Sequence, residues 1–252
     1  MSGKGPNGGG ASSGRRANLP KRFYQNVAVT DEGGRHALRL DGKMVRTPHK
    51  TLLALPTRTL AEAVAEEWRA QKERIDPETM PLTKLANSVI DGVMGREDAV
   101  IDDIMAHAAS DLLCYRAEAP QGLVAAQQAQ WDPLLAWAKD TLDAPFQPAE
   151  GVMHVAQPEA SLQGIRRQVK SHDPFSLAAL QVMTGLSGSA LLALAVALGR
   201  LTPDEAWAAA HVDEDWQISQ WGENEEAAAR RAHRRREFEA AARLLALLRV
   251  RV

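Results

Sequence analysis

Hydrophobic and polar positions alternate with a period of two near the start of the chain. The segment FYQNVAVT (23–30) is rich in aromatic and β-branched residues, and HALRL (36–40) alternates again. The Asp-Gly pair at 41–42 is a strong hairpin turn before KMVRT (43–47), and a short LLAL (52–55) follows. This pattern predicts an antiparallel unit of three or four strands. Such a unit is too thin to be stable alone and must dock on other elements.

After Pro56 the apolar residues recur every three or four positions, which is typical of helices. One helix is expected to begin at Thr57 or Thr59, with an apolar stripe on one face, and another to run from Glu97 to Tyr115. The Asp-Pro pairs at 132–133 and 173–174 are expected to begin two more helices. Asp is favoured as a helix N-cap, and Pro is favoured at the first helical position.

The C-terminal third has the clearest helix boundaries. The run from Ser189 to Gly199 is strongly apolar but has about half of the roughly twenty residues that cross a bilayer, so it is expected to be a buried helix. TPDE (202–205) is a capping box, and its helix is expected to continue to at least Gln217. A last helix, polar and then apolar, is expected from about Glu225 to Leu248.

These elements predict an α+β fold, with a small N-terminal antiparallel β unit docked on a larger all-α domain of seven to eight helices. Residues 1–18 are rich in Gly and Ser, have no apolar side chains to bury, and are expected to be a disordered tail. Residues 19–56 form the expected β-rich N-terminal domain. Residues 57–252 form the expected helical domain.

Composition narrows the class of function. The chain has 252 residues and a formal net charge of -2, so it has no global field to attract nucleic acid or an anionic membrane. Cys114 is the only cysteine, which excludes an internal disulfide and favours a reducing compartment. Its setting in SDLLCYR is typical of one helical turn, so we interpret Cys114 as a buried small side chain and not as a nucleophile.

The most informative segment is HVDEDWQISQWGENEE (211–226), in which an acidic cluster precedes two tryptophans that are five residues apart. Several carboxylates and two indoles cannot all be buried together. Three interpretations are open: a solvated helix face, a surface that binds a protein, or a catalytic cluster in which one acid has a raised pKa. The residues concerned are Asp213, Glu214, Asp215, Trp216, Gln217 and Trp221.

Other candidate sites are weaker. TGLSGSALLAL (184–194) lacks the Gly-Lys-Ser/Thr ending of a phosphate loop, and a helix capped by Ser187 or Ser189 explains it better. The basic run Arg230–Arg236 lies between acidic residues, so a helix with many ion pairs is favoured over a nucleic-acid site. The histidines have no metal-ligand spacing; they are His36, His49, His107, His154, His172, His211 and His233.

Seven short segments occur in order between about Lys21 and Leu248. They are KRFYQNVAV (21–29), LDGKMVRTP (40–48), Glu67-Trp68, MPLTKLANSVID (80–91), CYRAEAP (114–120), QWDPLLAWA (130–138) and EDWQISQWG (214–222). Each segment alone is weakly specific, but the ordered set is strong. In this set the chain resembles the ATP-twelve family of assembly chaperones for the catalytic sector of F-type ATP synthase, in its α-proteobacterial form.

The resemblance implies a chaperone that is not an enzyme. It would bind the free alpha subunit and prevent its self-association until the beta subunit takes the same surface. No catalytic residue, metal or other cofactor is implied. We further expect no nucleic-acid partner, no insertion into a membrane and a monomer when the protein is free. The expected compartment is the bacterial cytoplasm, or the mitochondrial matrix for a eukaryotic source.

Within the acidic segment, the resemblance points to Glu214 as the functionally important position. The expected partner-binding residues are therefore Glu214, Trp216, Gln217, Trp221, Asp213 and Asp215. The alternative is a small-molecule hydrolase that uses the cluster from His211 to Asp215. A deep pocket in which these acids converge with His211 or His233 would favour the hydrolase.

Overall fold

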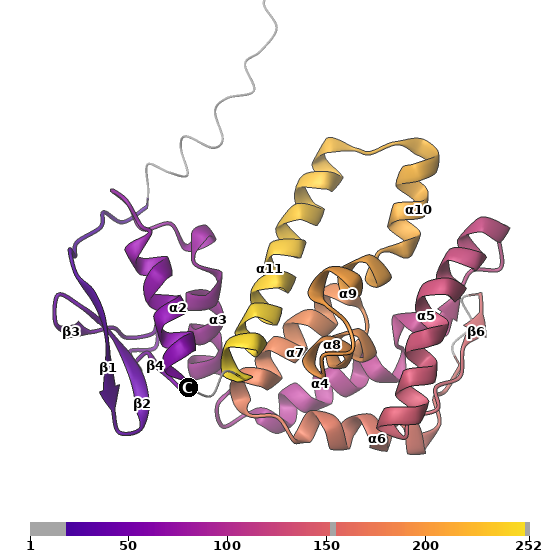
Figure 1. Cartoon of the computed structure of the whole chain (residues 1–252), viewed down its shortest axis with the longest axis horizontal. Helices are drawn as coiled ribbons and strands as arrows, with labels where there is room; N and C mark the ends of the chain where they lie inside the picture. The colour runs from indigo at the N-terminus through magenta and orange to yellow at the C-terminus, as the bar shows by residue number, and fades with distance from the viewer. Residues whose placement is uncertain (1–18, 152–154, 250–252) are drawn as a thin grey trace, which may run out of the picture. The chain divides into compact units, whose positions relative to one another are not determined.

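A computed structural model describes residues 19–151 and 155–249 of the chain. The expected tail at 1–18 and His154 lie outside these residues. The chain divides into two compact units, the first ending at Asn87 and the second beginning at Ser88. The elements of each unit are labelled in Figure 1.

The first unit contains a four-stranded antiparallel sheet, as the alternating pattern predicts. Its strands are β1 (Val27–Glu32), β2 (Arg35–Leu40), β3 (Lys43–Met44) and β4 (Ala54–Leu55), with β2 pairing with each of the other three. The hairpin between β2 and β3 turns at Asp41 and Gly42, whose φ angles are 47° and 80°. Positive φ at both positions is what a tight two-residue hairpin requires, and it explains why Asp-Gly occurs there.

Helix α2 (Arg58–Arg69) covers this sheet and contacts β1, β2 and β4. Thr57 caps it by accepting a hydrogen bond from the Leu60 amide, and the side chains of Leu60 and Val64 are fully buried. The first unit also includes the short 3₁₀ turn η1 (Pro77–Thr79) and nearly all of α3 (Pro81–Ser88). The division between units therefore lies at residues 87 and 88, not at 56 and 57, because α2 buries its apolar stripe on the sheet.

Within residues 88–151 and 155–249 the second unit contains eight α-helices, and the expected α+β class with a larger helical part is confirmed. The helices are α4 (Glu97–Ala109), α5 (Gln121–Leu142), α6 (Glu159–Lys170), α7 (Pro174–Ser187), α8 (Ala190–Ala197), α9 (Pro203–Ala210), α10 (Val212–Trp221) and α11 (Glu225–Arg249). Short pieces accompany them: the π-helical turn η2 (Val89–Val93), the 3₁₀ turn η3 (Leu112–Cys114) and the parallel pair β5 (Tyr115–Arg116) and β6 (Ala149–Glu150).

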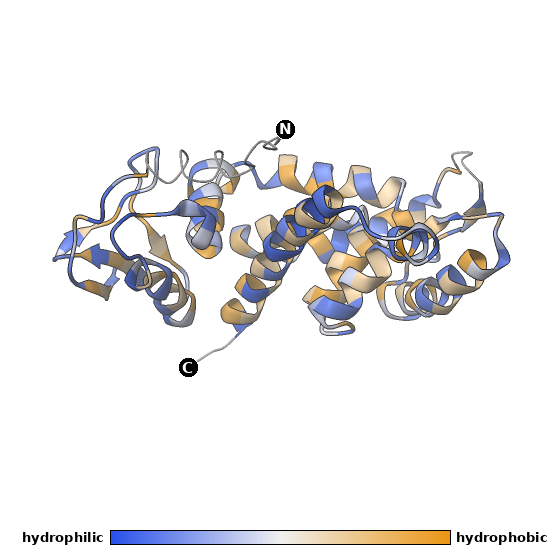
Figure 2. Ribbon diagram, turned by 90° about the horizontal axis from the view of Figure 1, so that it is seen from above, coloured by the Kyte–Doolittle hydropathy of each residue, from blue (hydrophilic) through white to orange (hydrophobic). Residues whose placement is uncertain are grey.

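Helix α7 is the centre of the second unit and contacts α4, α8 and α11. Every residue of α8 is buried, as expected for the apolar run. Figure 2 shows α11 as mostly hydrophilic at its start and more hydrophobic toward its end, where Phe238 and Leu244 are fully buried. Within the described part of the chain, no helix has both the length and the apolar character needed to cross a bilayer.

The Asp-Pro pair at 132–133 does not begin a helix, contrary to expectation. Helix α5 starts at Gln121 and continues through Pro133. The reason lies on the N-terminal side of the pair, where Trp131 is buried and its Nε1 donates to the Ala209 carbonyl oxygen at 2.8 Å. This packing outweighs the local preference of Pro for a helix start. The other pair behaves as expected, since Asp173 caps α7.

Two further helices are shorter than expected. Helix α4 ends at Ala109 instead of Tyr115, because Asp111 accepts a hydrogen bond from the Leu113 amide and begins the separate turn η3. The helix that begins at the capping box stops at Ala210, and α10 begins at Val212 after a break at His211. That break determines where the acidic segment lies.

Candidate functional site

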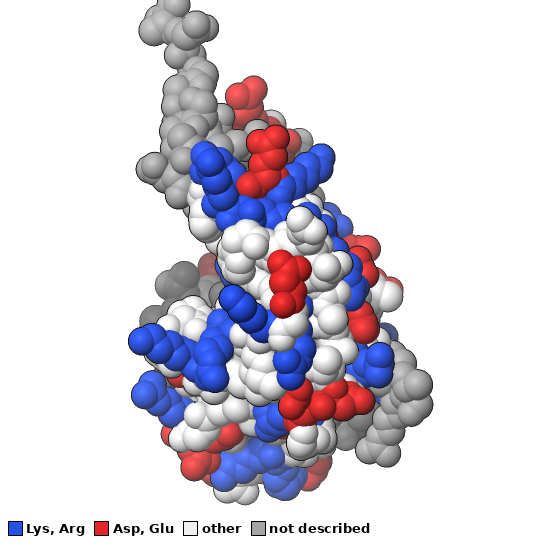
Figure 3. Space-filling model, turned by 90° about the vertical axis from the view of Figure 1, so that its left-hand side faces the viewer, with Lys and Arg blue, Asp and Glu red and all other residues white. Residues whose placement is uncertain are grey.

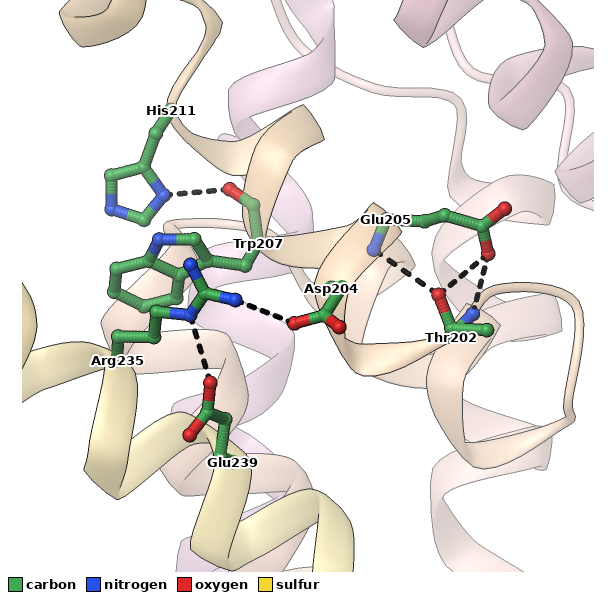
Figure 4. A network of polar contacts seen from close by, with 7 residues as sticks. All are labelled: Thr202, Asp204, Glu205, Trp207, His211, Arg235 and Glu239. Atoms are coloured by element: carbon green, nitrogen blue, oxygen red, sulfur yellow. Dashed lines mark hydrogen bonds and ion pairs between the residues drawn. The ribbon is translucent and has the colours of Figure 1, made fainter.

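The acidic segment follows α9 in the chain, so its position depends on how the start of α9 is held. Thr202 and Glu205 form the expected capping box, in which each side chain binds the other residue's backbone amide. The guanidinium of Arg235 on α11 contacts Asp204 at 2.7 Å and Glu239 at 2.8 Å (Figure 4). The Arg235–Asp204 ion pair therefore links the start of α9 to α11, while Glu239 binds the same guanidinium from within α11.

His211 separates α9 from α10. Its φ of -120° is not helical, and its ring stacks on Trp207 with the centroids 3.9 Å apart. Nδ1 lies 2.8 Å from the Trp207 carbonyl oxygen (Figure 4), and only 5% of the residue is exposed. Burial lowers the pKa of His211 below its ordinary value, which favours the neutral ring. His211 is therefore part of the packed base of the segment, not an exposed acid–base group.

The three carboxylates on α10 point to different partners. Asp213 accepts a hydrogen bond from Gln127 on α5 at 2.7 Å, and Asp215 forms an ion pair with Arg231 on α11. One Glu214 carboxylate oxygen lies 3.9 Å from Arg231 Nε and 4.0 Å from His211 Nε2. Asp213 and Asp215 thus attach α10 to its two neighbouring helices, whereas Glu214 makes only long contacts.

The two tryptophans differ sharply in their surroundings. Trp216 is half-buried on α5, where its ring occupies the space that a side chain at Gly122 would need. Trp221, the last residue of α10, is 79% exposed, more than any other large hydrophobic side chain in the described residues. Of the two tryptophans, Trp221 is therefore the one available as an apolar anchor for another molecule.

Figure 1 shows α10 and the start of α11 projecting together from the other helices of the second unit. Gly222 ends α10 with a φ of 83°, and Asn224 starts α11 by accepting hydrogen bonds from the Glu226 and Ala227 amides. Between the two helices lies an open hollow of about 250 Å³, which we call the tip hollow. Its lining includes Glu214, Gln217, Ile218, Trp221, Glu223 and Arg231, with Ala227 and Ala228.

The structure brings together three of the six expected site residues, because Glu214, Gln217 and Trp221 all line the tip hollow. Asp213, Asp215 and Trp216 lie elsewhere on α10 and contact α5 or α11. Ile218, Glu223 and Arg231 also line the hollow but were not among the expected site residues. Arg231 could have been found only by knowing that α11 returns alongside α10, since it stands far from the acids in the sequence.

The structure also places the other candidates. Ser189 caps α8, which confirms one of the two expected caps. Cys114 is buried, and burial raises the pKa of its thiol to about 12, so the interpretation of a buried small side chain is confirmed. No group of three or more metal-binding side chains occurs among residues 19–151 and 155–249.

The arginines at 230–236 mostly have acidic or carbonyl partners, which confirms the expected ion-paired helix. Arg230 pairs with Glu226, Arg231 with Asp215 and Arg235 with Glu239, and Arg234 donates to the Leu186 carbonyl oxygen. Basic and acidic side chains are also interspersed over the face of the molecule seen in Figure 3.

Comparison with known proteins gives consistent matches. The family model described as ATP12 chaperone protein matches residues 21–139. The crystal structure of Atu1473, a putative chaperone from Agrobacterium tumefaciens, has 49% identity and a TM-score of 0.89, over 92% of this chain and 87% of that one. The crystal structure of Atp12 from Paracoccus denitrificans has 43% identity and a TM-score of 0.88, over 91% of this chain and 99% of that one.

A more distant relative is the mitochondrial protein atp12 of Schizosaccharomyces pombe. It is 23% identical over 219 residues, which are 82% of this chain and 75% of that protein. The similarity to the Paracoccus protein is high in both sequence and structure and extends over nearly the whole of each chain. The chain therefore belongs to the ATP12 family of chaperones, which serve the assembly of ATP synthase.

Proposed function

We propose that this chaperone binds the free alpha subunit of the catalytic sector of F-type ATP synthase and prevents its self-association until the beta subunit replaces the chaperone. We further propose that the tip hollow, with Glu214, Gln217 and Trp221, is the surface that binds. Trp216, Asp213 and Asp215 support this surface by holding α10 on α5 and α11. The observation that carries the proposal is that Trp221, which is 79% exposed, lines a hollow together with the carboxylates of Glu214 and Glu223.

The physical requirements of such a chaperone match this surface. A subunit that awaits its partner exposes a large interface and is prone to aggregate. The chaperone must bind that interface and still be displaced, so its own contact has to be weaker than the final one. An exposed indole supplies an apolar anchor, and the surrounding Glu214 and Gln217 supply a polar rim that can exchange with water.

The geometry does not favour the alternative of a hydrolase. Of the three acids on α10, only Glu214 lines the tip hollow, and His211 is buried against Trp207. His233 lies beside Glu237 on α11, with 3.5 Å between Nε2 and the carboxylate. The acids and histidines therefore do not converge on one pocket, and we infer a binding role without catalysis.

The relatives support one further expectation, the compartment. Two of them come from bacteria, at 43% and 49% identity, and this supports action in the bacterial cytoplasm. We infer that the free protein is a monomer with one binding surface for one alpha subunit. Neither nucleic acid nor a membrane is required for this role.

The substitution Glu214→Lys tests the proposed surface. It reverses a charge in the tip hollow and is expected to weaken binding of the alpha subunit at least tenfold, which corresponds to about 1.4 kcal/mol. The free energy of unfolding should change by less than about 1 kcal/mol, because Glu214 makes only long, half-exposed ion contacts. Affinity would be measured by titration of purified alpha subunit, and stability by urea unfolding.

Asp140→Lys is the matched control, because Asp140 is an exposed carboxylate on α5 outside the tip hollow. It should leave the affinity unchanged. Absence of any complex between the wild-type protein and the alpha subunit would refute the proposed function itself. Unfolding of the Glu214→Lys protein would instead show that Glu214 is structural.

A further inference from the structure

The tip hollow combines three kinds of surface within about 250 Å³. The indole of Trp221 forms an aromatic wall, and Ile218 with Ala227 and Ala228 supplies aliphatic surface. Glu214 and Glu223 contribute two carboxylates. An aromatic face, an aliphatic surface and acidic groups together suit a long side chain that is apolar along its stem and positively charged at its end.

Arg231 also lines the hollow, but its positive charge is already paired with a carboxylate of this chain. Its Nη2 forms an ion pair with Asp215, and its Nε lies 3.9 Å from Glu214. Only 18% of its side chain is exposed. Among the residues that the structure describes, Glu223 has no basic partner within ion-pair distance. The hollow therefore retains negative charge that the chain itself does not neutralise.

We propose that the tip hollow binds an arginine side chain of the partner protein. The guanidinium would lie against the Trp221 ring, where the face of an indole attracts a cation more strongly than other aromatic side chains do. Its planar fork would donate hydrogen bonds to the Glu214 and Glu223 carboxylates. The methylene groups of the arginine would cover Ile218 and the two alanines. This proposal rests on the proposed function for the identity of the partner as the alpha subunit.

Other anchors fit the hollow less well. A leucine or phenylalanine would take the carboxylates of Glu214 and Glu223 out of water without a partner, which is costly. An acidic side chain would meet repulsion from both. A lysine offers a point charge that does not stack flat on the ring. An arginine satisfies the aromatic, aliphatic and acidic surfaces at the same time.

The first test uses the complex with the alpha subunit. We expect Trp221→Ala and Glu223→Gln each to weaken binding, the former about tenfold. Glu225→Gln is the matched control, because Glu225 is an exposed neighbouring carboxylate that does not line the hollow, and it should bind normally. A photo-crosslinking amino acid at position 221 should attach within two residues of an arginine of the alpha subunit.

Replacement of that arginine by glutamine should weaken binding, and combining it with Trp221→Ala should add little further loss, because both changes remove one contact. Additive losses, or attachment far from any arginine, would overturn the proposal while leaving alpha-subunit binding intact. Attachment beside a lysine would also overturn the choice of arginine.

The second test does not need the alpha subunit. The free protein is titrated with N-acetyl-arginine amide and with N-acetyl-citrulline amide, which has nearly the same shape without the charge. The indole NMR resonance of Trp221, identified by its loss in Trp221→Phe, should shift with arginine amide and not with citrulline amide. Equal shifts, or no shift with either compound, would refute an arginine site. Absence of an alpha-subunit complex would instead contradict the proposed function.

Discussion

The carboxylate of Glu67 accepts three hydrogen bonds at the beginning of α3. One oxygen binds the Leu82 amide at 2.8 Å, and the other binds the amide and the hydroxyl of Thr83 at 2.8 and 2.7 Å. These groups are buried, and the amides at a helix start have no partner within the helix. Glu67 belongs to one of the seven ordered sequence segments, and its place in the structure shows that it holds the first unit together.

Glu67→Gln should destabilise the first unit by about 2 kcal/mol. The amide group of Gln can replace one acceptor oxygen, but its NH₂ would face the donors of Leu82 or Thr83 and leave them unpaired. Urea unfolding followed by far-UV circular dichroism would measure the change. The neighbouring variant Glu66→Gln should cost less than about 0.5 kcal/mol, because Glu66 is exposed and pairs only with Arg69. Equal effects of the two variants would contradict this role.

The candidate site residues on α10 could be predicted from the sequence as a group, but the role of each residue could not. The acidic cluster and the two tryptophans were evident as a group that cannot be entirely buried. Which tryptophan faces a partner depends on whether another helix covers it. Gly122 leaves room for Trp216 on α5, and nothing comparable covers Trp221. That distinction comes from tertiary packing, and the spacing of the two tryptophans in the sequence does not predict it.

At the scale of elements, boundaries marked by capping residues were predictable. The capping box at Thr202, the Asp173-Pro174 start and the Asp-Gly hairpin are all found, because each depends on local backbone geometry. The helix start predicted at Asp132-Pro133 is wrong, because the burial of Trp131 keeps α5 continuous. The break at His211 was missed because it depends on stacking with Trp207.

The seating of α10 on α5 gives a prediction at this scale. Gly122→Ala would place a methyl group where the Trp216 ring lies, so the ring must move and its indole NMR resonance should shift. Alanine normally stabilises a helix interior relative to glycine by about 0.5–1 kcal/mol. Gly185→Ala on α7, where a methyl group would meet open space, should show that gain in urea unfolding, whereas Gly122→Ala should not. A full gain at Gly122 with an unchanged Trp216 resonance would contradict the described packing.

In the molecule as a whole, different sequence patterns predicted the sheet of the first unit and the helices of the second. Alternation and turns predicted the sheet, and helical periodicity predicted seven or eight helices over residues 57–252, where the described residues form ten α-helices. The boundary between the units was misplaced because amphipathic spacing shows that α2 has an apolar face but not what that face covers. The packing of α2 on the sheet makes it part of the first unit.

Hydrogen exchange of the full chain, with and without purified alpha subunit, shows whether the tip hollow is the surface that binds. Exchange is expected to slow on binding in peptides that cover residues 214–231, which include the residues of the tip hollow. Peptides from α6 (159–170) should be unchanged, because α6 contributes nothing to that hollow. Unchanged exchange at residues 214–231, with slower exchange elsewhere in the bound protein, would contradict binding at the tip hollow.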